Sequence, residues 1–157
     1  MKIKLIAIGK TDNSALQALI EDYKKRLSFY IKFELEIIPD IKNVKNLSEA
    51  QQKEKEGELI LSKISPIDHL VLLDENGKSF SSVSFSEELQ KKMNAGIKTL
   101  VFVIGGPYGF SDQVYAKANG KISLSQMTFS HQMVRLFFIE QVYRGFTILK
   151  NEPYHHQ

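Results

Sequence analysis

Two residues near the C-terminal end of the chain could bind an anion and move a proton. His131 and Arg135 are four residues apart in a segment with helical spacing, so both would lie near the start of one helix. The helix dipole disfavours the protonated form of a histidine in the first turn. Arg135 keeps its charge and suits a phosphate or a carboxylate. The pair is a candidate for catalysis, and the alternative is that both residues are structural.

The last seven residues, Asn151–Gln157, have an unusual composition for a chain end. Tyr154 could stack on a nucleic-acid base, and His155 could move a proton. Chain ends are usually disordered. A loose tail without a role is therefore the alternative.

Two loops that follow apolar strands have the composition of a ligand site. Gly105-Gly106-Pro107-Tyr108-Gly109 would let a ligand approach the backbone closely. Residues 124–129 offer short polar side chains and backbone amides beside Met127 and Phe129, which suits an adenine-bearing ligand. The first strand is followed by Gly9-Lys10-Thr11-Asp12, which lacks the glycine fingerprint of a dinucleotide site. NAD is therefore disfavoured, and either loop could also be a plain connection.

Alternating strands and helices must position these residues. Strands are expected at 2–8, 33–38, 69–73, 99–104 and 121–124. Helices are expected at 14–29, 48–63, 86–93, 111–118 and 130–149, and the second of them begins with a capping box at Ser48. A turn is expected at Asn76-Gly77, and Gly57 is expected to be a weak point of the second helix. This order predicts one α/β domain over 1–157, a parallel sheet between two helical layers. Ligands of such sheets bind beyond the carboxyl ends of the strands.

The helix from 130 to 149 is apolar around most of its circumference. Its polar stripe is narrow and consists of Glu140, Arg144, Thr147 and Asn151. A helix of this kind does not simply lie on the surface of a small monomer. We expect it either to pass through the core or to form an interface between subunits.

Composition excludes several classes of protein. The chain has 157 residues, 43% of them hydrophobic and 25% charged, which excludes a disordered, collagen-like or coiled-coil protein. Cysteine is absent, so disulfides and thiolate chemistry are impossible. No clustered metal ligands, membrane-length apolar run or signal sequence is visible, so we expect a cytoplasmic protein without metal. The net charge of +3 is weak, although the part from Lys98 onward is mildly basic and would suit an anionic partner.

Several motifs taken together resemble the RlmH family of SPOUT-class methyltransferases. The most specific are IGGPYG (104–109), LSQMTFSHQMVR (124–135), EQVYR (140–144) and a terminal PYH (153–155). The segments KLIAIGK (4–10), EKEGELIL (54–61) and LLDENGKSFSSVSFSEEL (72–89) extend the similarity over essentially the whole chain.

The resemblance implies a Rossmann-like α/β-knot fold with a C-terminal trefoil knot, and a homodimer. It also implies methylation, with S-adenosyl-L-methionine, of N3 of a pseudouridine in the helix 69 loop of 23S rRNA within the assembled 70S ribosome. By position in the motifs, the residues expected to bind the cofactor are Leu73, Gly105, Gly106, Leu124, Ser125, Gln126, Met127, Thr128 and Phe129.

The chemistry implied by the resemblance assigns provisional roles to the remaining candidates. The imide N3 must lose its proton during attack, so a base and a cation near the flanking carbonyls are expected. Arg135 is the candidate cation or phosphate ligand, His131 and His155 are rival proton acceptors, and Tyr154 is a stacking or orienting group. Ser130 and His156 depart from the family pattern of Pro and a basic residue. Two alternatives stay open, a SPOUT enzyme with another RNA target such as tRNA and a non-catalytic binding module.

Overall fold

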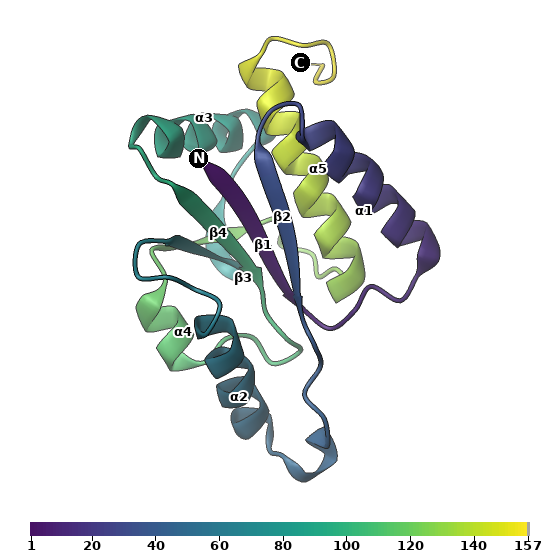
Figure 1. The fold of residues 1–157 in the computed structure, drawn as a ribbon, viewed down its shortest axis with the longest axis vertical. Coiled ribbons are helices and arrows are strands. Elements are labelled where there is room, and N and C mark those ends of the chain that lie inside the picture. Colours follow the sequence, from purple (N-terminus) through teal and green to yellow (C-terminus); the bar gives the residue numbers. More distant parts are fainter. Residues whose placement is uncertain (157) are drawn as a thin grey trace.

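The computed structural model describes residues 1–156, which form a five-stranded parallel sheet with helices on both faces (Figure 1). The strand order is β2-β1-β4-β3-β5, and every strand pair is parallel. The predicted three-layer α/β class is confirmed. In chain order, the elements are β1 (Lys2–Ile8), α1 (Ser14–Leu27), β2 (Lys32–Ile38), the short 3-10 helix η1 (Val44–Asn46), α2 (Glu49–Leu61), β3 (His69–Ser79), α3 (Ser82–Asn94), β4 (Thr99–Ile104), α4 (Asp112–Lys117), β5 (Gly120–Ser123) and α5 (His131–Leu149).

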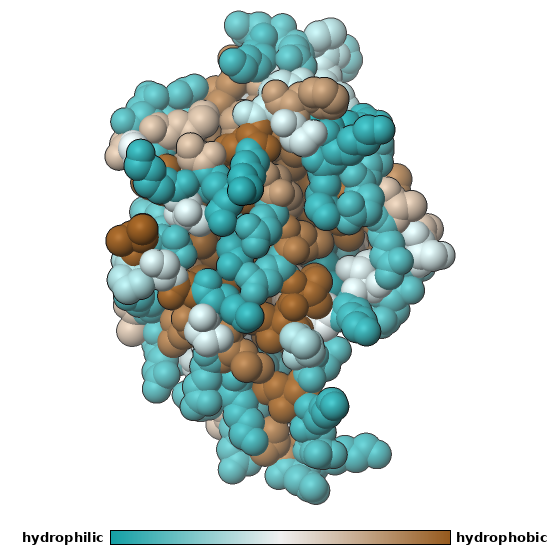
Figure 2. All heavy atoms as spheres, in the orientation of Figure 1, coloured by the Kyte–Doolittle hydropathy of each residue, from teal (hydrophilic) through white to brown (hydrophobic). Residues whose placement is uncertain are grey.

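Two apolar layers hold the helices to the sheet. α1, α3 and α5 pack on one face, whereas α2 and α4 pack on the other (Figure 1). At the exposed edge, Glu34 and Glu36 of β2 form ion pairs with Lys2 and Lys4 of β1. Figure 2 shows a band of apolar side chains between polar ones on the same side of the molecule. Charged side chains on an edge strand discourage pairing with another chain.

Helix starts follow the capping signals in the sequence. Ser48 and Gln51 form the expected capping box at the start of α2. Ser111 Oγ accepts a hydrogen bond from the Val114 amide, and Ser130 Oγ accepts one from the Met133 amide. Each cap satisfies a backbone N–H that has no partner within its helix, so the first turns of α4 and α5 are well defined.

The third strand continues beyond the expected turn at Asn76-Gly77. β3 runs to Ser79, and its register against β5 shifts between Leu73 and Lys78, which both lie opposite Ile122. A Cβ on Gly77 would lie 2.5 Å from the carbonyl carbon of Ile122, so only glycine allows the two strands to stay in contact there. The turn prediction was wrong because the segment bulges and then pairs again.

Gly57 is also not the weak point that the sequence predicts. It is buried within a continuous α2, and a Cβ there would lie 2.3 Å from Ser111 Oγ. The missing side chain lets α2 approach the start of α4 closely.

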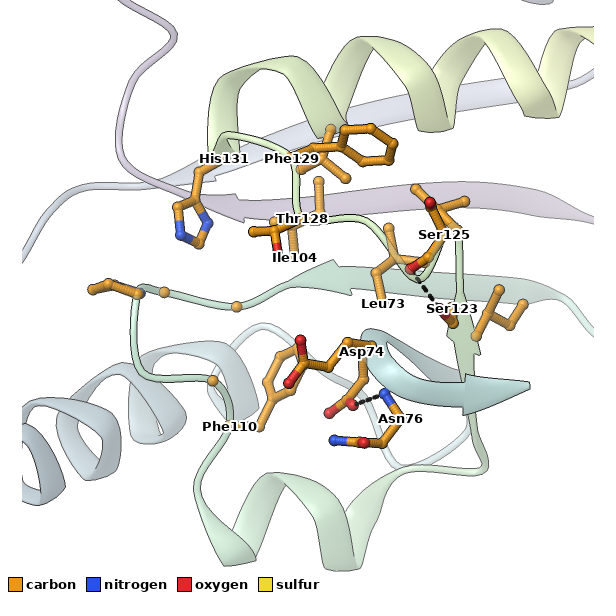
Figure 3. Close-up of a pocket in the computed structure, with 18 of the residues that line it drawn as sticks. Leu73, Asp74, Asn76, Ile104, Phe110, Ser123, Ser125, Thr128, Phe129 and His131 are labelled. Carbon is orange, nitrogen blue, oxygen red and sulfur yellow. Dashed lines mark hydrogen bonds between the residues drawn. The ribbon is translucent and has the colours of Figure 1, made fainter. Parts of the chain in front are cut away.

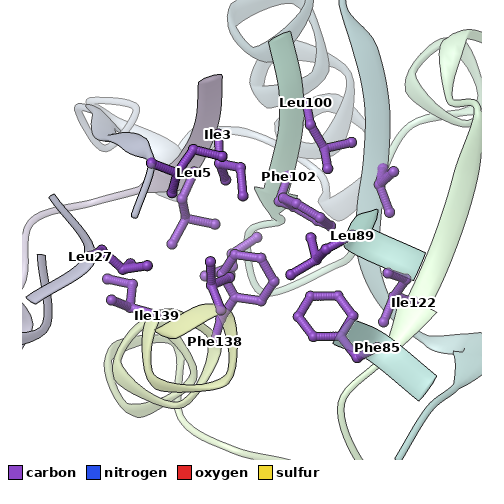
Figure 4. Packing of buried hydrophobic residues seen from close by; sticks show 14 of the residues in the cluster. Ile3, Leu5, Leu27, Phe85, Leu89, Leu100, Phe102, Ile122, Phe138 and Ile139 are labelled. Atoms are coloured by element: carbon purple, nitrogen blue, oxygen red, sulfur yellow. The ribbon is translucent and has the colours of Figure 1, made fainter. Parts of the chain in front are cut away.

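The core fixes α5 along the sheet (Figure 4). Phe138 is buried between Phe102, with a centroid distance of 4.7 Å, and Phe85, at 6.4 Å. Ile139, Val142 and Phe146 are buried on the same side of the helix. The expectation of a core helix is therefore confirmed for this face. The trefoil knot stays a prediction, and Gln157, the last residue of the expected domain, lies outside the described residues.

Phe138→Ala should lower the free energy of unfolding by roughly 3–5 kcal/mol, because it removes a fully buried ring. The matched control is Phe29→Ala, which truncates an exposed ring and should change stability by less than about 0.5 kcal/mol. Urea denaturation at one fixed protein concentration measures both. A similar loss for the two variants would contradict the described core.

Candidate functional site

The carboxyl ends of β4 and β5, together with residues 73–76 in the middle of β3, border a cavity of about 510 Å³ (Figure 3). Its lining includes all the predicted cofactor residues except Gln126: Leu73, Gly105, Gly106, Leu124, Ser125, Met127, Thr128 and Phe129. The structure thus brings together three segments that are far apart in the sequence. A cavity of this size suits a small ligand or cofactor.

Local hydrogen bonds shape two of the loops. The Gly109 amide donates to the Gly106 carbonyl at 3.2 Å, and Gly109 has a φ of 79°, which favours glycine. In the loop after β5, Ser123 Oγ donates to the Ser125 carbonyl at 3.0 Å, and the Met127 amide donates to Ser125 Oγ at 2.9 Å. These bonds hold both chain segments in tight turns at the cavity wall.

The segment after Leu73 forms a polar wall that sequence reasoning missed. Asp74 accepts hydrogen bonds from the Tyr115 hydroxyl and, at 2.8 Å, from the Asn76 amide. Burial, together with the hydrogen bond to the Asp74 carboxylate, raises the pKa of Tyr115 to about 12. Tyr115 therefore stays neutral and remains a donor. The available signal was the position of Asp-Glu-Asn directly after an apolar strand, where we expected only a turn.

Charges around the cavity favour a cationic ligand. Asp74 and Glu75 line it, and the buried carboxyl group of Glu56 lies directly behind Gly106. His131 is the one histidine, lysine or arginine among the lining residues. A pyrophosphate would meet carboxylates here, which further disfavours a dinucleotide such as NAD.

His131 lies at the cavity, as the sequence predicts, whereas Arg135 lies elsewhere. Figure 3 shows His131 at the start of α5, pointing toward the loop after β4. Arg135 is 1% exposed and does not line the cavity. It donates to Thr11 Oγ1 at 2.9 Å and to the Ile8 carbonyl at 2.7 Å. In this position Arg135 ties α5 to the end of β1, so the structure separates the predicted pair.

The tail is attached to α1 and α5. The Tyr154 hydroxyl donates to Glu140 Oε1 and lies 3.0 Å from the Tyr23 hydroxyl, while Arg144 lies over its ring. Burial and these hydrogen bonds raise the pKa of Tyr154. His155 Nδ1 lies 3.3 Å from Arg144 Nη1. The alternative of a loose tail is therefore wrong for Tyr154 and His155.

The tail follows the last residue of α5, whereas His131, which lines the cavity, is the first residue of this helix (Figure 1). The helix has 19 residues. At a rise of about 1.5 Å per residue, its two ends are about 28 Å apart. The tail folds back along α5, so that Tyr154 and His155 contact Glu140 and Arg144, about 14 and 20 Å along the helix from His131. Within one copy of the chain, neither tail residue lines the cavity.

A family model described as "Predicted SPOUT methyltransferase" matches residues 1–155. The chain belongs to the SPOUT methyltransferase family. It is similar over its whole length, and over all of each relative, to proteins named "Ribosomal RNA large subunit methyltransferase H". The identity is 85% to the protein of Flavobacterium psychrophilum, 83% to that of Flavobacterium johnsoniae and 68% to that of Parabacteroides distasonis.

SPOUT methyltransferases of this type use S-adenosylmethionine as methyl donor. The cavity fits this group, because two adjacent glycines open the backbone on one side and carboxylates face a ligand that carries a sulfonium charge. Within residues 1–156, no group of three or more histidine, aspartate or glutamate side chains could hold a metal ion. In the same range, no helix is long and apolar enough to cross a bilayer.

Gly105→Val should weaken binding of S-adenosylmethionine roughly tenfold or more, because the added atoms overpack the cavity wall. A Cβ at this position would already lie 3.1 Å from the Phe110 ring. Gly120→Ala is the control, since a Cβ there meets no atom within 4 Å. Titration calorimetry measures both, with NAD as a ligand that should not bind. Wild-type affinity in Gly105→Val would contradict the assignment of this cavity.

Proposed function

We propose that this protein methylates N3 of a pseudouridine in the helix 69 loop of 23S rRNA, within the assembled 70S ribosome in the bacterial cytoplasm, and that residues 1–157 act as one domain. The observation that carries the proposal is the cavity, which gathers the loops expected to bind S-adenosylmethionine in a SPOUT chain. The names of the full-length relatives support a large-subunit rRNA substrate. The position of the methylated atom rests on the resemblance to the RlmH family.

The reaction requires little covalent chemistry from the protein. Bound S-adenosylmethionine supplies an electrophilic methyl group. The chain has to hold N3 in line with that group and to accept the N3 proton. Glycines of the loop after β4 and amides of residues 124–129 would bind the cofactor, and His131 at the cavity would face the substrate.

The contacts of the two histidines favour His131 as the proton acceptor. Arg144 can only donate hydrogen bonds, so Nδ1 of His155 is the acceptor in their contact. The lone pair of this nitrogen is therefore already engaged by the Arg144 guanidinium. His131 has no such neighbour in the lining of the cavity. We therefore assign the role of proton acceptor to His131. His155 would instead form a hydrogen bond with the base or with the RNA backbone.

A homodimer would complete the site. Met127 is 76% exposed, and Phe137 is 39% exposed and packs against Phe129, with 4.9 Å between the ring centroids. Met127 and Phe129 also line the cavity, so this apolar patch adjoins the site. A second copy that covers the patch could bring its own Tyr154 and His155 over the cavity, which the tail of the same copy does not reach. The proposed site is therefore shared between two copies.

Methyl transfer to intact particles tests the proposed function. Tritium from labelled S-adenosylmethionine should enter 23S rRNA of 70S ribosomes that lack the modification, with little transfer to free subunits or tRNA. Efficient labelling of tRNA would support another SPOUT specificity. Absence of labelling in every substrate, with the cofactor bound, would support a non-catalytic binding module.

His131→Ala should lower kcat by roughly 10²-fold or more, as expected for loss of a proton acceptor. His155→Ala should lower kcat less, by about tenfold, because it loses one hydrogen bond. Rates measured at saturating ribosomes separate lost chemistry from lost RNA binding. The opposite order of effects would identify His155 as the acceptor.

Phe137→Glu should convert the dimer into a monomer, because it places a charge in the apolar patch beside the cavity. Ile139→Glu is unsuitable, since Ile139 is buried in the core of its own copy. Phe29→Glu is the control, because Phe29 is exposed in the turn after α1. Sedimentation at micromolar concentration measures the mass. A stable wild-type monomer would overturn the dimer.

A further inference from the structure

Glu56 of α2 is a carboxylate buried without a cation. It is 3% exposed, and its Oε1 accepts a hydrogen bond from Gln52 Nε2 at 3.0 Å. Its Oε2 has no hydrogen-bond partner among residues 1–156, and none of the ion pairs in that range includes it. Removing a carboxylate from water without a partner is costly. Such a group is stabilised by a proton or by a positive charge nearby, and no ion pair of residues 1–156 supplies that charge.

The carboxyl group of Glu56 packs against the cavity wall. A Cβ on Gly106 would lie 2.1 Å from Glu56 Oε2 and 2.6 Å from the carboxyl carbon. Gly106 itself lines the cavity. Only the backbone of one glycine therefore separates this carboxylate from a ligand, and any larger residue at position 106 would push it away.

We propose that Glu56 is a specificity-determining residue that provides the counter-charge for the sulfonium of the methyl donor, so that the cavity prefers S-adenosylmethionine to the demethylated product. The inference rests on the proposed function. The donor and S-adenosylhomocysteine differ by one methyl group and one positive charge. A fixed carboxylate in a site with little water distinguishes them by that charge. Methyl transfer removes the sulfonium charge, and this loss would then weaken binding of the product S-adenosylhomocysteine.

Neighbouring groups predict how Glu56 titrates. Burial is the main cause that raises the pKa of Glu56, Asp40 adds to it, and Gln52 and His131 oppose it. A cation bound in the cavity favours the ionised carboxylate and lowers this pKa again. Binding of the donor should therefore release a proton at a pH below the raised value. Asp74 and Glu75 also line the cavity, but they are unchanged in a variant of Glu56.

Titration calorimetry with both ligands tests the inference. In the full-length protein, Glu56→Gln should weaken binding of S-adenosylmethionine roughly tenfold and change that of S-adenosylhomocysteine less than about twofold. Glu58→Gln is the control, an exposed glutamate on the same helix that should leave both affinities unchanged. Equal weakening of both ligands would make Glu56 merely structural and would overturn the inference, as would unchanged binding. A wild-type protein that binds neither compound would overturn the proposed function first.

Proton release gives a second readout that does not need a variant of Glu56. The heat of binding to the wild type is measured at several values between about pH 5 and 7, in two buffers that differ in ionisation enthalpy. S-adenosylmethionine should release more protons than S-adenosylhomocysteine, and this difference should persist in His131→Asn. Equal release by the two ligands would contradict the role of Glu56.

Discussion

The rigidity of α5 is the constraint on which the proposed site depends. Phe138, Val142 and Phe146 are buried against the sheet along most of the helix, so α5 cannot bend without loss of the core. His131 is therefore held at the cavity, while the Tyr154 hydroxyl is held at Glu140, nine residues and about 14 Å further along the helix. A reaction that uses both residues requires two copies of the chain. The apolar patch around Phe137 offers the surface on which they could meet.

The parallel sheet brings several loops together at one site. The strands β3, β4 and β5 point the same way, so Leu73, Ile104 and Ser123 deliver the following segments to one cavity. Glycines then bring backbone close to the ligand, while Glu56 and Asp74 set the sign of the local charge. The mild positive charge of the C-terminal part of the chain does not extend into the cavity. Cofactor and RNA would thus meet surfaces of different charge, consistent with a cationic donor and an anionic substrate.

Much of this arrangement could be predicted from the sequence because the signals are local. Strand Thr99–Ile104 is a continuous apolar run that ends at glycine, and Ser48, Ser111 and Ser130 mark helix starts. The carboxyl-end rule then placed the two main loops together without any knowledge of their contacts. The shared cavity of residues 105–109 and 124–129 follows from topology alone.

Other features depend on contacts between distant segments, which spacing cannot reveal. Helical spacing put His131 and Arg135 on one helix, but only packing shows that Arg135 points to β1 instead of the cavity. Glu56 belongs to a charged helix with weak periodicity, and its contact with Gly106 joins two segments 50 residues apart. The attachment of Tyr154 to Tyr23 is likewise invisible in a terminal sequence that resembles a loose end.

Complementation between two impaired variants tests the shared site most directly. Gly105→Val damages the cavity, and a variant that combines Tyr154→Ala with His155→Ala damages the tail. In a mixed dimer, one chain has an intact cavity and the other has an intact tail. If the tail serves the cavity of the partner, each mixed dimer contains one complete site. Random mixing of equal amounts should then restore about a quarter of the wild-type methylation rate of ribosomes. If the tail served the cavity of its own copy, every site in every dimer would carry one lesion, and a mixture no more active than either variant alone would contradict the shared site.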